Sequence, residues 1–167
     1  MELEPEQVFR ALLQGDEHAL SQGALSFDWQ TEDQRWGTPL IALISGNCDP
    51  ANRAIGDAKL RIAERCITQG ANPQQHAPCN CTWELQVVDE WWMGIGGQSA
   101  LSIVWAMIHA LNKRIRREHD HVERFQGADI DTVRDLDRMK RECGFWLEMQ
   151  STFIGAVSEE PRVHILK

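Results

Sequence analysis

The chain of 167 residues contains no tyrosine, and no hydrophobic stretch in it approaches the roughly 20 residues that cross a lipid bilayer. Positive charge is also scarce, since 17 Lys and Arg face 25 Asp and Glu and leave a net charge of −8. This acidic balance argues against general binding to nucleic acids or to anionic membranes. Residues 1–6 are acidic, so they lack the character of a signal or transit peptide.

Cysteine occurs in an odd number, five, which argues against a disulfide framework. Cys48, Cys66 and Cys143 fall in apolar or helical segments, whereas Cys79 and Cys81 flank a single residue of a loop. Free thiols are typical of a reducing compartment. We therefore expect an intracellular, cytoplasmic protein without membrane insertion, and a single domain that is long enough to bury a core.

Two short segments carry helix boundary signals. Thr38 can cap the first free N–H groups of a helix, and Pro39 suits the first helical position, because its missing N–H is not needed there. Gly70 can take the left-handed conformation that ends a helix, and the Asn-Pro pair at 72–73 then turns the chain. The segment 97–101, Gly-Gln-Ser-Ala-Leu, repeats the start signal in weaker form. A start, a stop and a second start predict a repeating helical hairpin.

These residues resemble the ankyrin repeat, a unit of about 33 residues with two antiparallel helices, a projecting turn and the signature T-P-L-H-x-A. The specific matches are Thr-Pro-Leu at 38–40 and Gly-Ala-Asn-Pro at 70–73. Ile41 stands where the family has His, and 61 residues separate Thr38 from Ser99, nearly twice the length of one unit. Insertions inside the central unit and between residues 73 and 97 would absorb this excess.

The resemblance and the hydrophobic pattern together predict an all-α fold, a short ankyrin-like stack of helix-turn-helix units with an extended hairpin or loop inserted. We expect one domain over residues 1–167, with units at about 5–29, 33–73 and 97–150, an insertion at 74–96 and a tail at 151–167. Apolar residues at helical spacing predict helices at 5–14, 17–23, 38–45, 57–69, 99–124 and 131–150. The insertion is rich in β-forming residues, and the end of the tail, 163–167, is also β-prone.

A zinc site is the first chemical alternative. His76, Cys79 and Cys81 offer zinc-ligating side chains, and Cys66 or Cys48 could supply a fourth ligand. The motif is incomplete, because zinc sites normally use two paired knuckles and this chain has a single Cys-x-Cys. A loop with free thiols is therefore favoured over a zinc-binding protein or a zinc enzyme, and we predict no cofactor.

The other reactive side chains do not form a recognisable catalytic set. Cys66 and Cys143 fall on apolar helical stripes, where a buried and unreactive thiol is expected. His119 and His121 point about 200° apart on a helix, so they cannot share one ligand face. The basic run 113–117 suits an exposed helix face balanced by nearby acidic residues. We expect no catalytic residue, and nucleic-acid binding through the basic run is the least favoured alternative.

The seven tryptophans are the clearest indication of a binding surface. Trp83, Trp91 and Trp92 all fall in the insertion, and tryptophan is prominent among the residues that dominate protein interfaces. The competing role for them is to cover the end of the helical stack. Trp105 and Trp146 lie on helical stripes, so we expect both in the core.

The resemblance to ankyrin repeats implies a protein partner bound through the repeat surface and the projecting turns. We therefore predict a non-enzymatic protein–protein interaction module, which serves as a scaffold or as a subunit of a larger assembly, and we expect no small-molecule ligand. The predicted contact residues are Asn72, Pro73, Gln74, Gln75, Trp83, Trp91, Trp92 and Met93.

Overall fold

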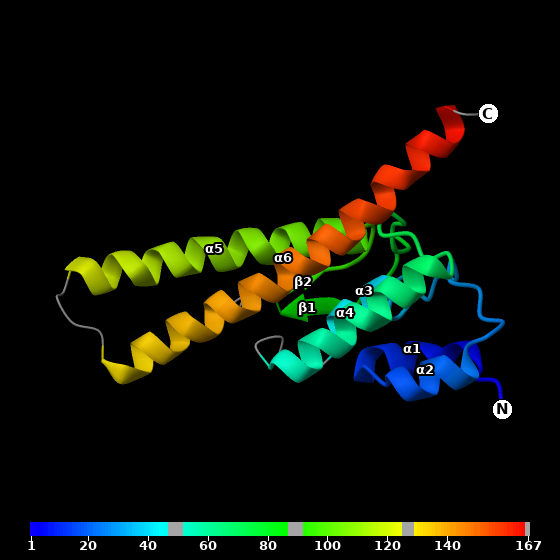
Figure 1. The fold of residues 1–167 in the computed structure, drawn as a ribbon, viewed down its shortest axis with the longest axis horizontal. Coiled ribbons are helices and arrows are strands. Elements are labelled where there is room, and N and C mark those ends of the chain that lie inside the picture. The colour runs from blue at the N-terminus through cyan, green and yellow to red at the C-terminus, as the bar shows by residue number, and fades with distance from the viewer. Residues whose placement is uncertain (47–51, 87–91, 125–128, 166–167) are drawn as a thin grey trace.

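A computed structural model describes residues 1–46, 52–86, 92–124 and 129–165 of the chain, and within these ranges the fold is mostly helical (Figure 1). The elements in chain order are α1 (Pro5–Gln14), α2 (Glu17–Gly23), α3 (Pro39–Ser45), α4 (Arg53–Thr68), β1 (Glu84–Gln86), β2 (Trp92–Gly94), α5 (Ala100–Arg124) and α6 (Ile130–Ile165). The two strands form an antiparallel hairpin in which Leu85 faces Met93. In the described ranges no helix combines the length and the apolarity that crossing a bilayer requires.

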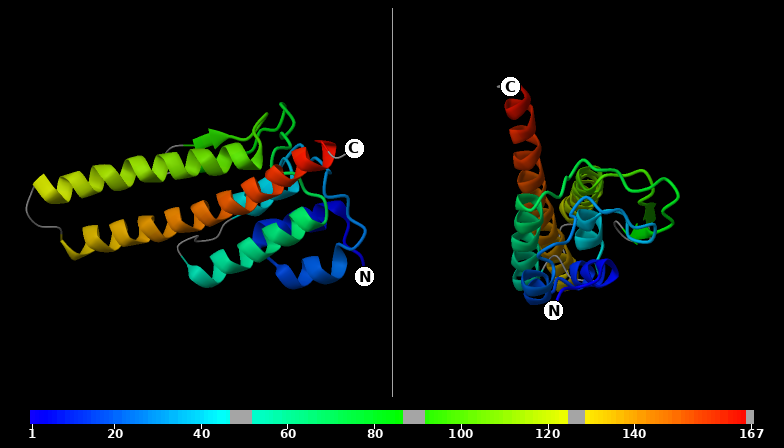
Figure 2. Two further views of the ribbon diagram at one scale, coloured as in Figure 1. Left: turned by 45° about the horizontal axis from the view of Figure 1, so that its top comes forward. Right: turned by 90° about the vertical axis from the view of Figure 1, so that its right-hand side faces the viewer.

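The helices form antiparallel pairs arranged in two rows (Figure 2, right). The first helices of the pairs, α1, α3 and α5, lie in one row, and α3 contacts both of its neighbours. The second helices, α2, α4 and α6, form the other row, in which α4 contacts α6. The guanidinium of Arg61 on α4 also lies 3.1 Å from the Glu17 carboxylate on α2. The hairpin lies on the side of the row that contains α5 and α3.

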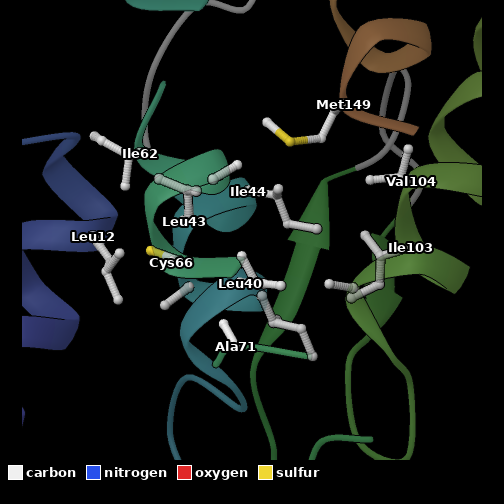
Figure 3. Packing of buried hydrophobic residues seen from close by; sticks show 14 of the residues in the cluster. Leu12, Leu40, Leu43, Ile44, Ile62, Cys66, Ala71, Ile103, Val104 and Met149 are labelled. Carbon is white, nitrogen blue, oxygen red and sulfur yellow. The ribbon is translucent and has the colours of Figure 1, made fainter. Parts of the chain in front are cut away.

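Helix α3 forms the centre of the core (Figure 3). Its residues from Pro39 to Ile44 are all buried, because helices or loops cover it on every side. Leu40 and Leu43 are at most 1% exposed. The surrounding side chains drawn in Figure 3 are Leu12 from α1, Ile62 and Cys66 from α4, Ile103 and Val104 from α5, and Met149 from α6.

The helix start predicted at Thr38 and the helix end predicted at Gly70 are both confirmed. The Thr38 hydroxyl accepts a hydrogen bond from the Ile41 amide at 3.3 Å and caps α3, with Pro39 in the first turn. Gly70 has a φ of 112°, which only glycine adopts without strain, and the chain turns away from α4 there. Helices 5–14 and 17–23 are confirmed. Helix α4 begins four residues before the predicted start at 57, because the Asn52 side chain accepts a bond from Ala54 N and caps it.

Two predictions are wrong. The segment predicted as a tail from residue 151, with a β-prone end at 163–167, is instead helical as far as Ile165, because α6 continues to that residue. The helix extends because its apolar stripe does not end at residue 150: Phe153 is fully buried, one turn beyond Met149. Trp105 is not a core residue, since 56% of it is exposed, whereas Trp146 is buried as expected.

Candidate partner-binding groove

A concave hollow of about 1060 Å³ lies between the hairpin and α6, and we call it the hairpin groove. The hairpin contributes residues 82–86 and Trp92 to its lining. Helix α6 contributes Arg138, Glu142, Phe145 and Trp146, and Lys59 of α4 and Met107 of α5 complete the sides. The last residues of α1 and α3 also line the groove. Five helices and the two strands of the hairpin, which are distant in the sequence, therefore meet at one surface.

The groove is rich in aromatic side chains. Phe145 and Trp146 of α6 pack edge to face, with ring centroids 4.8 Å apart, and both are buried. Trp83 lies half-buried before β1, and Trp92 on β2 is 55% exposed. Clusters of aromatic side chains, some buried and some exposed, are typical of surfaces that bind proteins.

The most unusual polar group in the groove is Lys59. Its side chain is 2% exposed, and its Nζ donates a hydrogen bond of 2.5 Å to the Leu43 carbonyl near the end of α3. An ammonium carries three donors, and among the described side chains no carboxylate lies within ion-pair distance of this one. Buried charges in proteins are normally paired, so Lys59 is under-satisfied.

Two indole groups in the same groove also have no hydrogen-bond acceptor. The Nε1 atoms of Trp83 and Trp146 are buried and without a partner. An unsatisfied buried donor typically costs about 1–3 kcal/mol. Together with Lys59, these side chains place three buried donor groups in the lining of the groove, and the two indole groups have no acceptor.

The predicted contact residues divide between two places. Trp83 and Trp92 line the hairpin groove, whereas Met93 is half-buried in the hairpin and is not part of the lining. Trp91 lies outside the described residues. None of the turn residues 72–75 lines the groove.

The turn at 72–75 is mostly used within the molecule. Asn72 Oδ1 accepts a bond from Gln74 N at 2.9 Å, and the buried Pro73 accepts one from the Leu101 amide at 3.0 Å. Gln75 Nε2 donates to the Gln30 carbonyl at 2.7 Å and so joins two successive loops. Gln74 is exposed and lines a separate hollow of about 430 Å³ together with His76 and Trp105.

The candidate zinc ligands are not gathered around one point. His76 Nδ1 lies 2.8 Å from the Gly97 carbonyl, Cys79 is exposed, and Cys81 is buried with its thiol 3.5 Å from the Arg35 carbonyl. Within the described residues, the group of three metal-ligating side chains whose atoms lie together is instead His119, Asp120 and Glu123, all exposed on α5. Cys48 lies outside the described residues.

The buried thiols have the electrostatics of core residues. Burial raises the pKa of the Cys66 thiol to about 12. Burial, with a smaller effect from Glu142, also raises the pKa of Cys143, which donates to Asn112 Oδ1 at 3.6 Å. A reactive cysteine needs a lowered pKa, so neither thiol has the environment of a nucleophile.

The sequence interpretation missed Lys59 and the Trp146 nitrogen as features of the site. Lys59 carries a signal that could have identified it, because it falls at helical spacing with the buried residues Gly56, Ile62, Ala63 and Cys66 of α4. A cation on an apolar helical stripe is unusual. Trp146 gave no comparable signal, since a core tryptophan normally finds a partner for its N–H.

No protein-family model matches this chain, and comparisons with curated proteins and with solved structures find no significant match. The resemblance to ankyrin repeats therefore stays a prediction.

Proposed function

We propose that this chain is a non-enzymatic protein-binding module that holds a segment of a partner protein in the hairpin groove. The observation that carries the proposal is the position of Trp92, which is 55% exposed at a concave surface lined by Trp83, Phe145 and Trp146. Exposure of so large an apolar group has a cost in water, and burial against a partner removes that cost.

The helical arrangement supports a module of the ankyrin-repeat type. Antiparallel pairs, a row of first helices in mutual contact and loops joined by Gln75 are all expected of such a stack. The Thr38 cap and the left-handed Gly70 lie at the start and the end of the central pair. The unusual feature is the last pair, whose helices have 25 and 36 residues, against 7 and 16 in the central pair.

The dimensions of the groove favour a chain segment over a metabolite. Sites for small molecules usually have volumes of about 300–1,000 Å³ and enclose most of the ligand. The hairpin groove has about 1060 Å³, at the upper limit of this range, and its lining comes from the hairpin and from five helices. A surface assembled from so many elements, with both aromatic and charged side chains, suits the side chains of a peptide segment.

Two single variants test the proposal. Trp92→Ala removes the exposed ring at the groove, and Trp105→Ala removes a ring of the same exposure, 56%, that lies at the other hollow. Neither ring is in the core, so both variants should keep the fold. Affinity capture with the full chain should retain one companion with the unmodified protein and with Trp105→Ala. The same companion should be bound at least tenfold more weakly by Trp92→Ala.

Two outcomes would contradict the proposal. One is the absence of a specific companion for any of the three proteins. The other is a companion that is lost with Trp105→Ala and kept with Trp92→Ala, since binding would then take place at the hollow beside Gln74.

A further inference from the structure

The buried donors of the hairpin groove point to the chemistry of the group that fills it. Lys59 is buried, and its ammonium has the Leu43 carbonyl as its acceptor. The Nε1 atoms of Trp83 and Trp146 are shielded as well and have no acceptor. All three side chains line the same groove. A group that accepts hydrogen bonds and carries negative charge would satisfy all three.

The acidic side chains of the groove do not supply this group. Glu142 already has an interaction of its own, and Glu84 is exposed to solvent on β1. Arg138, the other cation of the lining, also has a partner. Lys59 is therefore the cation whose charge is not balanced among the described residues of this groove.

A structural role explains only part of this arrangement. Lys59 does satisfy one of the carbonyl groups that the end of α3 leaves without a partner. A neutral donor such as a buried water would serve the same purpose without a buried charge. Burying a charge without a charged partner is costly, so folding alone gives little reason for an ammonium at this position. The ammonium is therefore better explained by binding than by folding.

We propose that the partner segment anchors in the hairpin groove through one aspartate or glutamate side chain, whose carboxylate accepts hydrogen bonds from Lys59 and from the indole N–H groups of Trp83 and Trp146. This proposal rests on the function proposed above and specifies the chemistry of the partner. A carboxylate carries one negative charge and matches the single unbalanced ammonium, whereas a phosphate group carries about two. The ring of Trp92 then covers the apolar residues beside the anchor.

The Nε1 atoms of Trp83 and Trp146 are buried, so the carboxylate reaches them only with a local rearrangement of the groove, for which the small hairpin is the element of least intrinsic stability. Its strands have three residues each and pair only with one another. A two-stranded sheet of this size has little stability of its own. Trp83 lies directly before β1, so movement of the hairpin would carry one of the donors with it.

The test uses the full chain and pools of fluorescein-labelled octapeptides with blocked ends, in which one position is fixed and the others are random. The fixed residue is Glu, Gln, phosphoserine or Lys, and binding is measured by fluorescence anisotropy. We expect a Glu pool to bind at least tenfold more tightly than the matching Gln pool, as for a hydrogen bond to a charged group. This preference should persist at 0.3 M salt, because buried charges are weakly screened.

Three variants assign the preference to its residues. Lys59→Met should abolish the difference between the Glu and Gln pools, and Lys59→Arg should retain part of it. Trp146→Phe keeps an aromatic ring but removes one donor, so it should reduce the difference severalfold. Lys113→Met, on the exposed part of α5, is the matched control and should change nothing. A thermal melt of each variant confirms that it is folded.

The outcomes separate this inference from the function on which it rests. Equal binding of the Glu and Gln pools, or a Glu preference that survives in Lys59→Met, overturns the carboxylate anchor, while a companion that depends on Trp92 still supports the protein-binding function. Phosphoserine pools that bind tenfold better than Glu pools also overturn it. If no pool binds and no companion is captured, both proposals fail.

Discussion

The body around α3 differs sharply from the arm, which consists of residues 112–124 of α5 and 130–142 of α6 (Figure 1). The same two helices belong to both parts. In α5 the buried residues run from Ala100 to Leu111 and then stop, while the helix continues to Arg124. In α6 burial begins at Cys143 and continues through Phe153. Helical periodicity in the sequence therefore does not by itself indicate which part of a helix is buried in the core.

The side chains of the arm are less deeply buried than those of the body. Arg114 and Glu118 form an ion pair of 3.0 Å, but both belong to α5, so the pair stabilises the helix and not the contact between helices. Ile115 and Met139 are only partly buried against the core. The hairpin groove lies where the arm joins the body, because its α6 side begins at Arg138 in the arm and ends at Trp146 in the core.

The largest expected effect comes from truncating the centre of the body. Leu43→Ala removes a fully buried side chain of α3 and should lower the free energy of unfolding by about 2–5 kcal/mol. Val133→Ala in the arm removes a side chain that is 47% exposed and should cost less than about 0.5 kcal/mol. Chemical denaturation measures both values. Similar losses for the two variants would contradict the distinction between body and arm.

A second pair of variants makes the same comparison with glycine. In Gly46→Ala the new methyl group would overlap with the Leu13 carbonyl group, so α1 and α3 must move apart at a cost of about 1–3 kcal/mol. Gly144→Ala on α6 meets no atom within 4 Å, and it should stabilise the helix by about 0.5–1 kcal/mol. Thermal melting gives the two shifts. Stabilisation by Gly46→Ala would show that the two helices do not approach as described.

Lys59 lies in the body, although a charged side chain is normally found on the surface. Its replacement therefore tests whether every buried residue of the body stabilises the fold. Lys59→Met should leave the protein as stable or raise its free energy of unfolding by about 1 kcal/mol, because removing a buried charge without a charged partner outweighs the loss of one hydrogen bond. Denaturant titration at neutral pH tests this. A loss of more than about 2 kcal/mol would mean that the bond to the Leu43 carbonyl is essential to the fold.

The smallest perturbation is chemical labelling of thiols in the native protein. Cys79 is exposed and should react first with iodoacetamide at pH 8. Cys66 should react only after unfolding, since burial raises its pKa from 9.0 to about 12. Because the pKa of this thiol is higher in the folded than in the unfolded protein, its contribution to the free energy of unfolding is complete below pH 9.0, the unfolded-state pKa. That contribution is lost as the pH rises toward about 12. Mass spectrometry after short labelling identifies the modified residue, and early labelling of Cys66 would contradict its place in the core.

Much of the fold could be predicted because its signals are local. Thr38 and Gly70 act through their own backbone groups, so the limits of the central helical pair followed from the sequence. The extent of α6 could not be read as easily, because Phe153 stabilises the helix through packing against distant residues. The exposure of Trp105 escaped prediction for the same reason, since its position on an apolar stripe does not tell where the neighbouring helices end.

The candidate site was only partly predictable. Trp83 and Trp92 were identified from their place in the insertion, and both line the hairpin groove. Lys59 and Trp146 could not be connected with them, because α4, α6 and the hairpin meet only in the folded protein. The turn at 72–75 has the composition of a contact surface, but the side chain of Gln75 donates a hydrogen bond to the Gln30 carbonyl within the molecule.

The most direct test of the central claim places a photo-crosslinking phenylalanine derivative, p-benzoylphenylalanine, at position 92 or at position 105 of the full chain. These two sites have almost the same exposure, 55% and 56%, but face different hollows. The proposed function predicts a discrete crosslinked partner from position 92 and none from position 105. A partner crosslinked from position 105 alone, or from neither position, would contradict the claim that the hairpin groove is the binding surface.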